Sequence, residues 1–125
     1  PIMIVDDLAD NRAIMERNLA ELGFKTVSAV NGLDALQKLK DLPELHSIML
    51  DLMMPEMNGF DFLTRLRQHL KWRDVPVFVI TAIDLTPEQS ATLMETASTV
   101  ICRHGRPIET ALDEVVSTLR LRTNA

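Results

Sequence analysis

The apolar residues of the chain fall into short strand-like runs separated by longer stretches with helical spacing. Ile2 to Val5 is a continuous apolar run, which is typical of a strand buried on both faces. Four further segments have strand character, over residues 26–30, 47–50, 75–80 and 99–102. The remaining stretches predict five helices: one that follows Asp10 and is stopped by Gly23, one over residues 33–42, one over 59–70, one from the segment 86–89 to about 97, and one from Pro107 onward.

Local signals mark several element ends. Asp10 is the expected N-cap of the first helix, and Gly23 ends that helix. Thr86 to Gln89 forms a capping box with proline at the first helical position. Pro76 fits the start of its strand, where a missing backbone donor costs least. The apolar faces of the helices supply the predicted core, which includes Ile14, Met15, Leu19, Leu22, Leu33, Leu36, Leu39, Phe60, Leu63, Leu66, Ile108, Leu112, Val115 and Leu119.

The alternation of strands and helices predicts an α/β fold in which helices cover both faces of a parallel sheet. In such sheets, ligands bind beyond the carboxyl ends of the strands, where the strand order reverses. The residues at those ends are Asp6 and Asp7, Asp51, Thr81 and Arg103. If the strand order is 2-1-3-4-5, the three carboxylates meet at one edge, which is unfavourable unless a cation sits among them. An all-oxygen site of this kind suits Mg²⁺, or Mn²⁺ in its place.

This set of groups is suited to phosphoryl transfer. A carboxylate can attack phosphorus while a metal ion and a fixed positive charge neutralise the transferring oxygens. A hydroxyl such as that of Thr81 can donate to one of those oxygens. The prediction depends on the strand order, which the residue pattern alone leaves open.

Three segments at these strand ends resemble the receiver domain of two-component response regulators, the CheY-like superfamily. They are Ile4 to Asp7, Met49 to Gly59 (MLDLMMPEMNG) and Val79 to Ala82, and the stretch from Asn31 to Leu36 fits the same family pattern. The resemblance covers nearly the whole chain, and related receivers occur in hybrid histidine kinases and multidomain regulators. It implies a flavodoxin-like, doubly wound five-stranded parallel sheet of order 2-1-3-4-5 with five helices.

The resemblance also implies a role for each matching residue. Asp51 would be the phosphoacceptor, and Thr81 would be the switch hydroxyl that turns toward the phosphoryl group. Asp7 would bind Mg²⁺ directly, Asp6 would do so largely through water, and Met53 would offer its backbone carbonyl. The phosphoryl donor would be a histidine on a histidine kinase or a histidine phosphotransfer protein.

The chain departs from the family pattern at the fifth strand. The family usually carries a lysine there, followed by proline, and this chain has two arginines instead. Arg103 ends the strand and stands 22 positions after Thr81, the expected spacing, whereas Arg106 precedes Pro107 and imitates the lysine–proline pair. We favour Arg103 and keep Arg106 as the alternative. The usual aromatic switch residue is also missing: its place is held by Val100 if Arg103 replaces the lysine, or by Arg103 itself if Arg106 does.

Composition limits the remaining possibilities. The 125 residues fit one domain, expected over residues 1–121 with a tail or linker over 122–125. The net charge of −5 argues against a nucleic-acid-binding surface. The single cysteine, Cys102, suits a reducing cytoplasm, and no apolar run approaches the length of a membrane span.

The sequence therefore predicts a phosphoacceptor receiver that switches an attached or separate output partner, with a homodimer left open. No enzymatic activity is expected beyond self-catalysed phosphorylation and dephosphorylation. One alternative is a pseudo-receiver, an interaction module with impaired phosphorylation. A phosphohydrolase is disfavoured because the second acid of such enzymes would stand at Met53.

Overall fold

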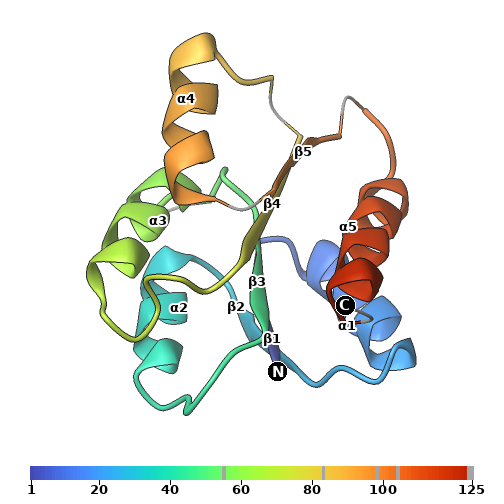
Figure 1. Ribbon diagram of the computed structural model, residues 1–125. Helices are drawn as coiled ribbons and strands as arrows, with labels where there is room; N and C mark the ends of the chain where they lie inside the picture. Colours follow the sequence, from blue (N-terminus) through green and yellow to red (C-terminus); the bar gives the residue numbers. More distant parts are fainter. Residues whose placement is uncertain (55, 83, 98, 104, 124–125) are drawn as a thin grey trace.

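The computed structural model describes residues 1–54, 56–82, 84–97, 99–103 and 105–123, with no side chains described beyond residue 118. The described residues form a five-stranded parallel sheet of order β2-β1-β3-β4-β5 (Figure 1). The strands are β1 (Ile2–Val5), β2 (Thr26–Ala29), β3 (Ser47–Leu50), β4 (Val77–Thr81) and β5 (Thr99–Cys102). The helices are α1 (Ala9–Glu21), α2 (Gly32–Leu39), α3 (Gly59–Gln68), α4 (Pro87–Thr96) and α5 (Ile108–Thr123). The predicted flavodoxin-like fold and strand order are confirmed.

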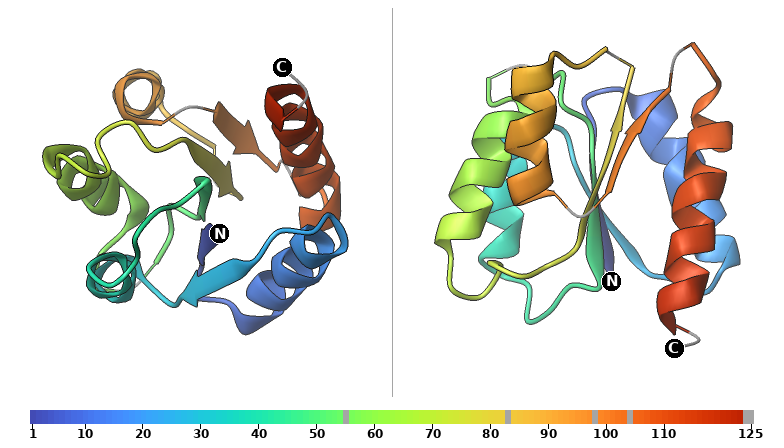
Figure 2. Two further views of the ribbon diagram at one scale, coloured as in Figure 1. Left: turned by 60° about the horizontal axis from the view of Figure 1, so that its bottom comes forward. Right: turned by 45° about the horizontal axis from the view of Figure 1, so that its top comes forward.

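Helices cover both faces of the sheet. Figure 2 shows α1 and α5 on one face and α2, α3 and α4 on the other. Alternate residues of each central strand enter separate cores: Ile2 and Ile4 pack with α1 and α5, whereas Met3 and Val5 pack with α2 and α3. Continuous apolar strands are therefore required, because each strand residue meets a helix layer on its own side.

The pairing of β1 with β3 positions the acidic residues. Val5 and Leu50 are partners in the parallel register, and the Asp51 N–H donates to the Val5 carbonyl at 3.0 Å. Asp6 and Asp51 are the residues that follow this last pair. Their side chains therefore emerge at the same carboxyl edge of the sheet, as the predicted strand order requires.

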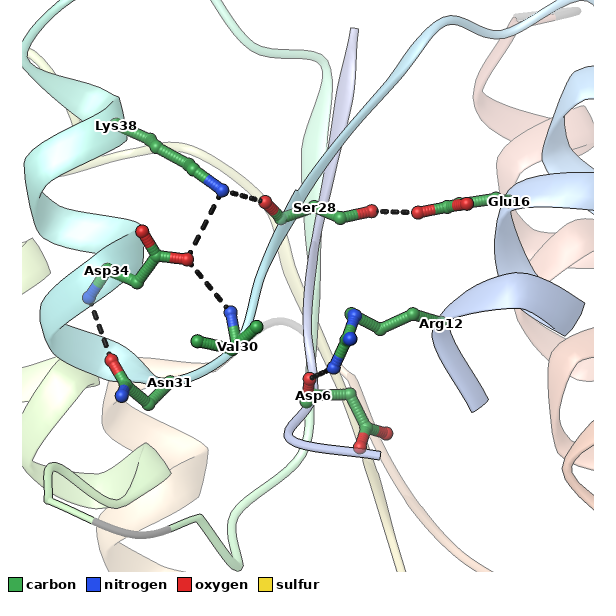
Figure 3. A network of polar contacts seen from close by, with 8 residues as sticks. All are labelled: Asp6, Arg12, Glu16, Ser28, Val30, Asn31, Asp34 and Lys38. Atoms are coloured by element: carbon green, nitrogen blue, oxygen red, sulfur yellow. Dashed lines mark hydrogen bonds and ion pairs between the residues drawn. The ribbon is translucent and has the colours of Figure 1, made fainter. Parts of the chain in front are cut away.

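Polar contacts hold the edge strand β2 between the two helix layers. The Ser28 hydroxyl donates to Glu16 of α1, and the Lys38 ammonium of α2 donates to the Ser28 carbonyl (Figure 3). Lys38 also pairs with Asp34 at 3.2 Å, and Asp34 accepts from the Val30 N–H at 3.0 Å. These contacts connect β2 to both faces at the edge where it lacks a second strand neighbour.

Most predicted element ends are close to the observed ones, and one prediction is wrong. Gly23 ends α1 with a φ of 90°, and the capping box at Thr86 has both of its hydrogen bonds. Asp10 is not the N-cap of α1: the helix begins after Leu8, and no side chain caps it. The reason is that Asp6 accepts from the Leu8 N–H and so turns the chain before Asp10 is reached.

The predicted core is largely observed. Eight of the predicted residues are buried: Met15, Leu19, Leu39, Leu63, Leu66, Ile108, Leu112 and Val115. Leu33 is a correction, because its side chain is 41% exposed and lines an open groove between α2 and α3. The side chain of Leu119 lies outside the described residues. The fourth strand starts at Val77, after Pro76, whose carbonyl still accepts from the Ile48 N–H at 2.9 Å.

Two helices begin in the same way, with an asparagine N-cap followed by glycine. Asn31 accepts from Asp34 at the start of α2, and Asn58 accepts from Asp61 at the start of α3. A Cβ on Gly59 would lie 2.8 Å from the Leu52 Cα and 2.9 Å from the Asp51 carbonyl oxygen. This close approach packs the start of α3 directly against the chain that carries Asp51.

We predict that Gly59→Ala destabilises the fold by about 2 kcal/mol, because a methyl group there collides with backbone atoms. Gly32→Ala is the matched control, since its Cβ meets the flexible Met57 side chain, with Cγ at 2.8 Å. Urea unfolding of both variants measures the difference. An equal or smaller loss for Gly59→Ala would contradict the packing described here.

Candidate functional site

Three carboxylates gather at the carboxyl edge of the sheet. One oxygen each from Asp6, Asp7 and Asp51 lies within 4.8 Å of the other two. Asp6 and Asp7 follow β1, and Asp51 follows β3. The side chain of Asp6 is buried, with 2% of its surface exposed. The predicted acidic cluster is thus formed by these three residues.

Backbone and side-chain donors hold Asp6 in place. Its Oδ1 accepts from the Leu8 N–H at 2.9 Å, and its Oδ2 accepts from Asn11 Nδ2 at 3.2 Å. The Arg12 guanidinium donates to the Asp6 backbone carbonyl at 2.7 Å (Figure 3). Asp51 is held by backbone groups: its Oδ1 accepts from the Met53 N–H at 3.3 Å, and the Leu52 N–H also lowers its pKa. Backbone or side-chain donors therefore orient both carboxylates.

The cluster raises the pKa of its members. Burial raises the pKa of Asp51 to about 6, the charges of Asp6 and Asp7 add to the rise, and the Met53 N–H opposes it. Burial likewise raises the pKa of Asp6 above its ordinary value. Both shifts have the direction expected when carboxylates lie together away from water. A bound cation would remove the repulsion, and three carboxylate oxygens are a donor set that hard divalent cations prefer.

A cavity of about 220 Å³ opens beside the acidic cluster. Its walls come from four strand ends and from the starts of α1 and α5, namely Asp6, Asp7, Leu8, Asn11, Asp51, Met53, Ile80, Ala82, Arg103 and Ile108. Arg103, which follows β5, supplies the fixed positive charge. One cavity therefore brings together the three acidic residues, Met53 and Arg103.

Thr81 and Arg106 are not among the described residues that line this cavity. Thr81 is the last residue of β4 and is fully buried, and its neighbours Ile80 and Ala82 line the cavity. The Thr81 carbonyl accepts from the Arg103 N–H at 2.8 Å, which connects the two strand ends. The Arg106 guanidinium is bonded to Glu114 at 2.9 Å and to the Cys102 carbonyl at 3.0 Å.

The sequence interpretation missed Asn11. This residue lines the cavity and fixes Asp6, yet nothing in its pattern separated it from the other polar residues of its helix. Its place in the first turn after the paired acids is the one signal that could have found it. Leu8 was missed as well, because its contribution to Asp6 is a backbone N–H, which any residue carries.

Comparison with known proteins identifies the family of this chain. The family model of the response regulator receiver domain matches residues 2–109. The chain belongs to this family. The chemotaxis protein CheY1 of Helicobacter pylori is 32% identical over 81 residues, which are 64% of this chain and 65% of that protein. The sensor histidine kinase CheAY of the same species is 32% identical over 82 residues, 65% of this chain and 10% of that protein.

Solved structures give the same result for the fold. The response regulator protein TrrA of Thermotoga maritima, in complex with Mg(2+)-BeF, has a TM-score of 0.75 and 25% identity. The match covers 94% of this receiver domain and 96% of that chain. The receiver domain spans less than two thirds of the length of the curated relatives described above, which include a sensor histidine kinase. None of its described helices is long and apolar enough to span a membrane.

The raised pKa of Asp51 predicts how the stability of this receiver domain depends on pH. The folded state holds a proton on Asp51 up to about pH 6, whereas the ordinary pKa is 3.8. The ionised side chain therefore lowers the free energy of unfolding as the pH rises from about 4 to 6, and the full penalty remains above that range.

In metal-free buffer, Asp51→Asn should increase the free energy of unfolding at pH 8 by about 2 kcal/mol. At pH 4 the increase should be close to zero, because Asp51 is then protonated and resembles asparagine. Denaturant unfolding at both pH values measures the effect. The exposed Glu44→Gln is the control and should show no such pH-dependent gain. A gain for Asp51→Asn that is equal at both pH values would contradict the electrostatic cause.

Proposed function

We propose that this receiver domain accepts a phosphoryl group on Asp51 from a phosphohistidine of a histidine kinase or a histidine phosphotransfer protein. The single observation that carries the proposal is the cavity in which Asp51 shares its walls with Asp6, Asp7 and Arg103. Membership of the receiver family gives the reaction class. TrrA, which shares the fold, is described in complex with Mg(2+)-BeF, and this supports a divalent ion and a phosphoryl-like group at the corresponding edge.

The acidic cluster fits a divalent cation. Asp7 and Asp51 would hold Mg²⁺ directly, Asp6 would bind it largely through water, and Met53 would add its backbone carbonyl. Mn²⁺ should substitute, because it accepts the same oxygen donors. When bound, the cation would neutralise the carboxylates and the oxygens of the incoming phosphoryl group.

Asp51, Arg103 and Thr81 carry out the steps of the phosphoryl transfer. An Asp51 carboxylate oxygen attacks phosphorus in line with the bond to the donor nitrogen, that bond breaks, and the imidazole leaves with its electron pair and takes up a proton. Arg103 contacts the transferred oxygens as a fixed cation. Thr81 turns its hydroxyl toward the phosphoryl group once the transfer is complete. This movement shifts the conformation of the face formed by α4, β5 and α5.

The same acidic site would catalyse its own dephosphorylation by water, and we propose no other enzymatic activity. The phosphorylated face would then act on an attached or separate output domain in the cytoplasm. The pseudo-receiver alternative is less favoured, since Asp6, Asp7 and Asp51 come together in one cluster. The replacement of the usual lysine by Arg103 preserves the positive charge.

Exposed apolar side chains beside the cavity support a protein as the phosphoryl donor. Leu8 and Met53 both line the cavity, and their side chains are 55% and 57% exposed. Two large, exposed apolar residues that line an acidic cavity offer a contact to a protein surface that a small phosphoryl donor cannot use.

The first test is phosphorylation by acetyl phosphate. Intact-protein mass spectrometry should show one added phosphoryl group on wild-type protein in the presence of Mg²⁺ and none after chelation. Asp51→Asn should abolish the addition, and Glu44→Gln should leave it unchanged. Labelling of Asp51→Asn at the wild-type rate would show that the acceptor assignment is wrong.

The second test separates the protein donor from the small one. Leu8→Ala should slow transfer from a phosphorylated histidine phosphotransfer protein about fivefold and leave transfer from acetyl phosphate unchanged. Leu70→Ala is the matched control, because Leu70 is 86% exposed and follows α3, whose C-terminal end lies away from the cavity. The docking role of Leu8 is wrong if both variants transfer from the protein donor at the same rate.

A further inference from the structure

The two arginines after β5 are joined by a reciprocal pair of side-chain contacts. Arg103 Nε donates to the Arg106 carbonyl at 3.2 Å, and Arg106 Nε donates to the Arg103 carbonyl at 2.9 Å. The Arg106 N–H also donates to the Arg103 carbonyl at 2.9 Å. Each guanidinium therefore closes the turn on the backbone of the other residue, and the turn contains Gly105 with a φ of 78°.

The two terminal nitrogens of the Arg106 guanidinium bind groups of β5 and α5. Its Nη2 donates to the Cys102 carbonyl at 3.0 Å, and its Nη1 pairs with Glu114 of α5 at 2.9 Å. Nε, Nη1 and Nη2 of Arg106 are thus all engaged, and Arg106 is not among the described residues that line the acidic cavity. Arg106 connects the end of β5 to the second turn of α5.

Among the described residues, the Arg103 guanidinium is tethered at one atom: Nε donates to the Arg106 carbonyl, and no hydrogen bond to these residues engages its terminal Nη atoms. A guanidinium can divide its donors in this way, because Nε and the two Nη atoms point in different directions. A lysine ammonium has a single nitrogen at the end of its chain, so tethering it to the backbone would occupy the group needed at the site.

We propose that Arg106 is a positioning residue: its guanidinium binds the Arg103 and Cys102 carbonyls and Glu114 of α5, and so fixes the turn in which the Arg106 carbonyl holds Arg103 Nε beside the acidic cavity. The proposal rests on the proposed function, in which Arg103 contacts the phosphoryl oxygens. It gives the second arginine a role distinct from the first, and it makes the orientation of Arg103 depend on α5. A substitution of Glu114 should then change the rate of phosphorylation.

The test is a double-mutant cycle on the rate of phosphorylation by acetyl phosphate at saturating Mg²⁺. Arg103→Ala should reduce the rate about tenfold, and Arg106→Ala should reduce it about threefold. In the Arg103→Ala background, Arg106→Ala should cause no further loss, because there is then no guanidinium to orient. Arg106→Lys should behave like Arg106→Ala, since it keeps the charge and loses the Nε and Nη contacts.

Three outcomes would overturn the proposal. The first is a threefold loss from Arg106→Ala in the Arg103→Ala background as well as in the wild type, which would indicate general destabilisation of the turn. The second is full activity of Arg106→Lys, which would show that charge alone matters. The third is a wild-type rate for Arg103→Ala.

Different results would disprove the proposed function and this inference. Its failure appears as labelling of Asp51→Asn, or as no labelling of the wild type by either acetyl phosphate or a phosphohistidine protein. Labelling of wild-type Asp51 with an unaffected Arg103→Ala leaves the proposed function standing and removes only the role of the arginine pair. Thermal unfolding of each variant, with Glu114→Ala included, checks that the rates are compared on folded protein.

Discussion

Three carboxylates repel one another at one edge of the sheet, and the fold holds them together against that repulsion. The parallel register of β1 with β3 places Asp6 and Asp51 after the last paired residues, Val5 and Leu50. The pairing that builds the sheet therefore also forces the acids together. Burial and mutual repulsion raise the pKa of Asp51 to about 6, so the folded domain holds this group in an unfavourable state at neutral pH.

The surrounding packing makes that arrangement tolerable. Strand residues enter a helix layer on each face, and the start of α3 lies against the backbone at Leu52 through Gly59. Asp6 is fixed by the Leu8 N–H and by Asn11, so it cannot move away from Asp51. The stability lost at the acidic edge is compensated by the core, and a cation or a transferred phosphoryl group can then act on a preformed site.

Sequence reasoning succeeded where a residue acts through its own type and its position at a strand end. Asp6, Asp7 and Asp51 are such residues: strand alternation placed them at strand ends, and the strand order implied by the family resemblance placed those ends side by side. It failed where backbone hydrogen bonds or tertiary packing determine where a helix begins and which side chains are buried. Asp10 looked like an N-cap, but the turn made by Asp6 and Leu8 starts the helix earlier. Leu33 fitted the apolar spacing of its helix, and only the tertiary arrangement shows that it lines an open groove.

The choice between Arg103 and Arg106 also lay beyond sequence reasoning. Both residues carry the same charge near the end of β5, and spacing and the proline neighbour favour different ones. Their partners separate them, because Arg103 lines the acidic cavity and Arg106 bonds to Glu114 and Cys102. Side-chain direction after a turn depends on contacts from elsewhere in the chain, and a residue pattern does not record these contacts.

Chemical trapping of the acyl phosphate identifies the phosphorylated residue directly. Borohydride reduces an aspartyl phosphate to homoserine, and peptide mass spectrometry then locates the altered residue. We expect homoserine at position 51 after treatment with a phosphohistidine donor and Mg²⁺, and unaltered aspartate at positions 6 and 7. Homoserine at position 6 or 7 with none at 51 would contradict the assignment of Asp51 as the phosphoacceptor.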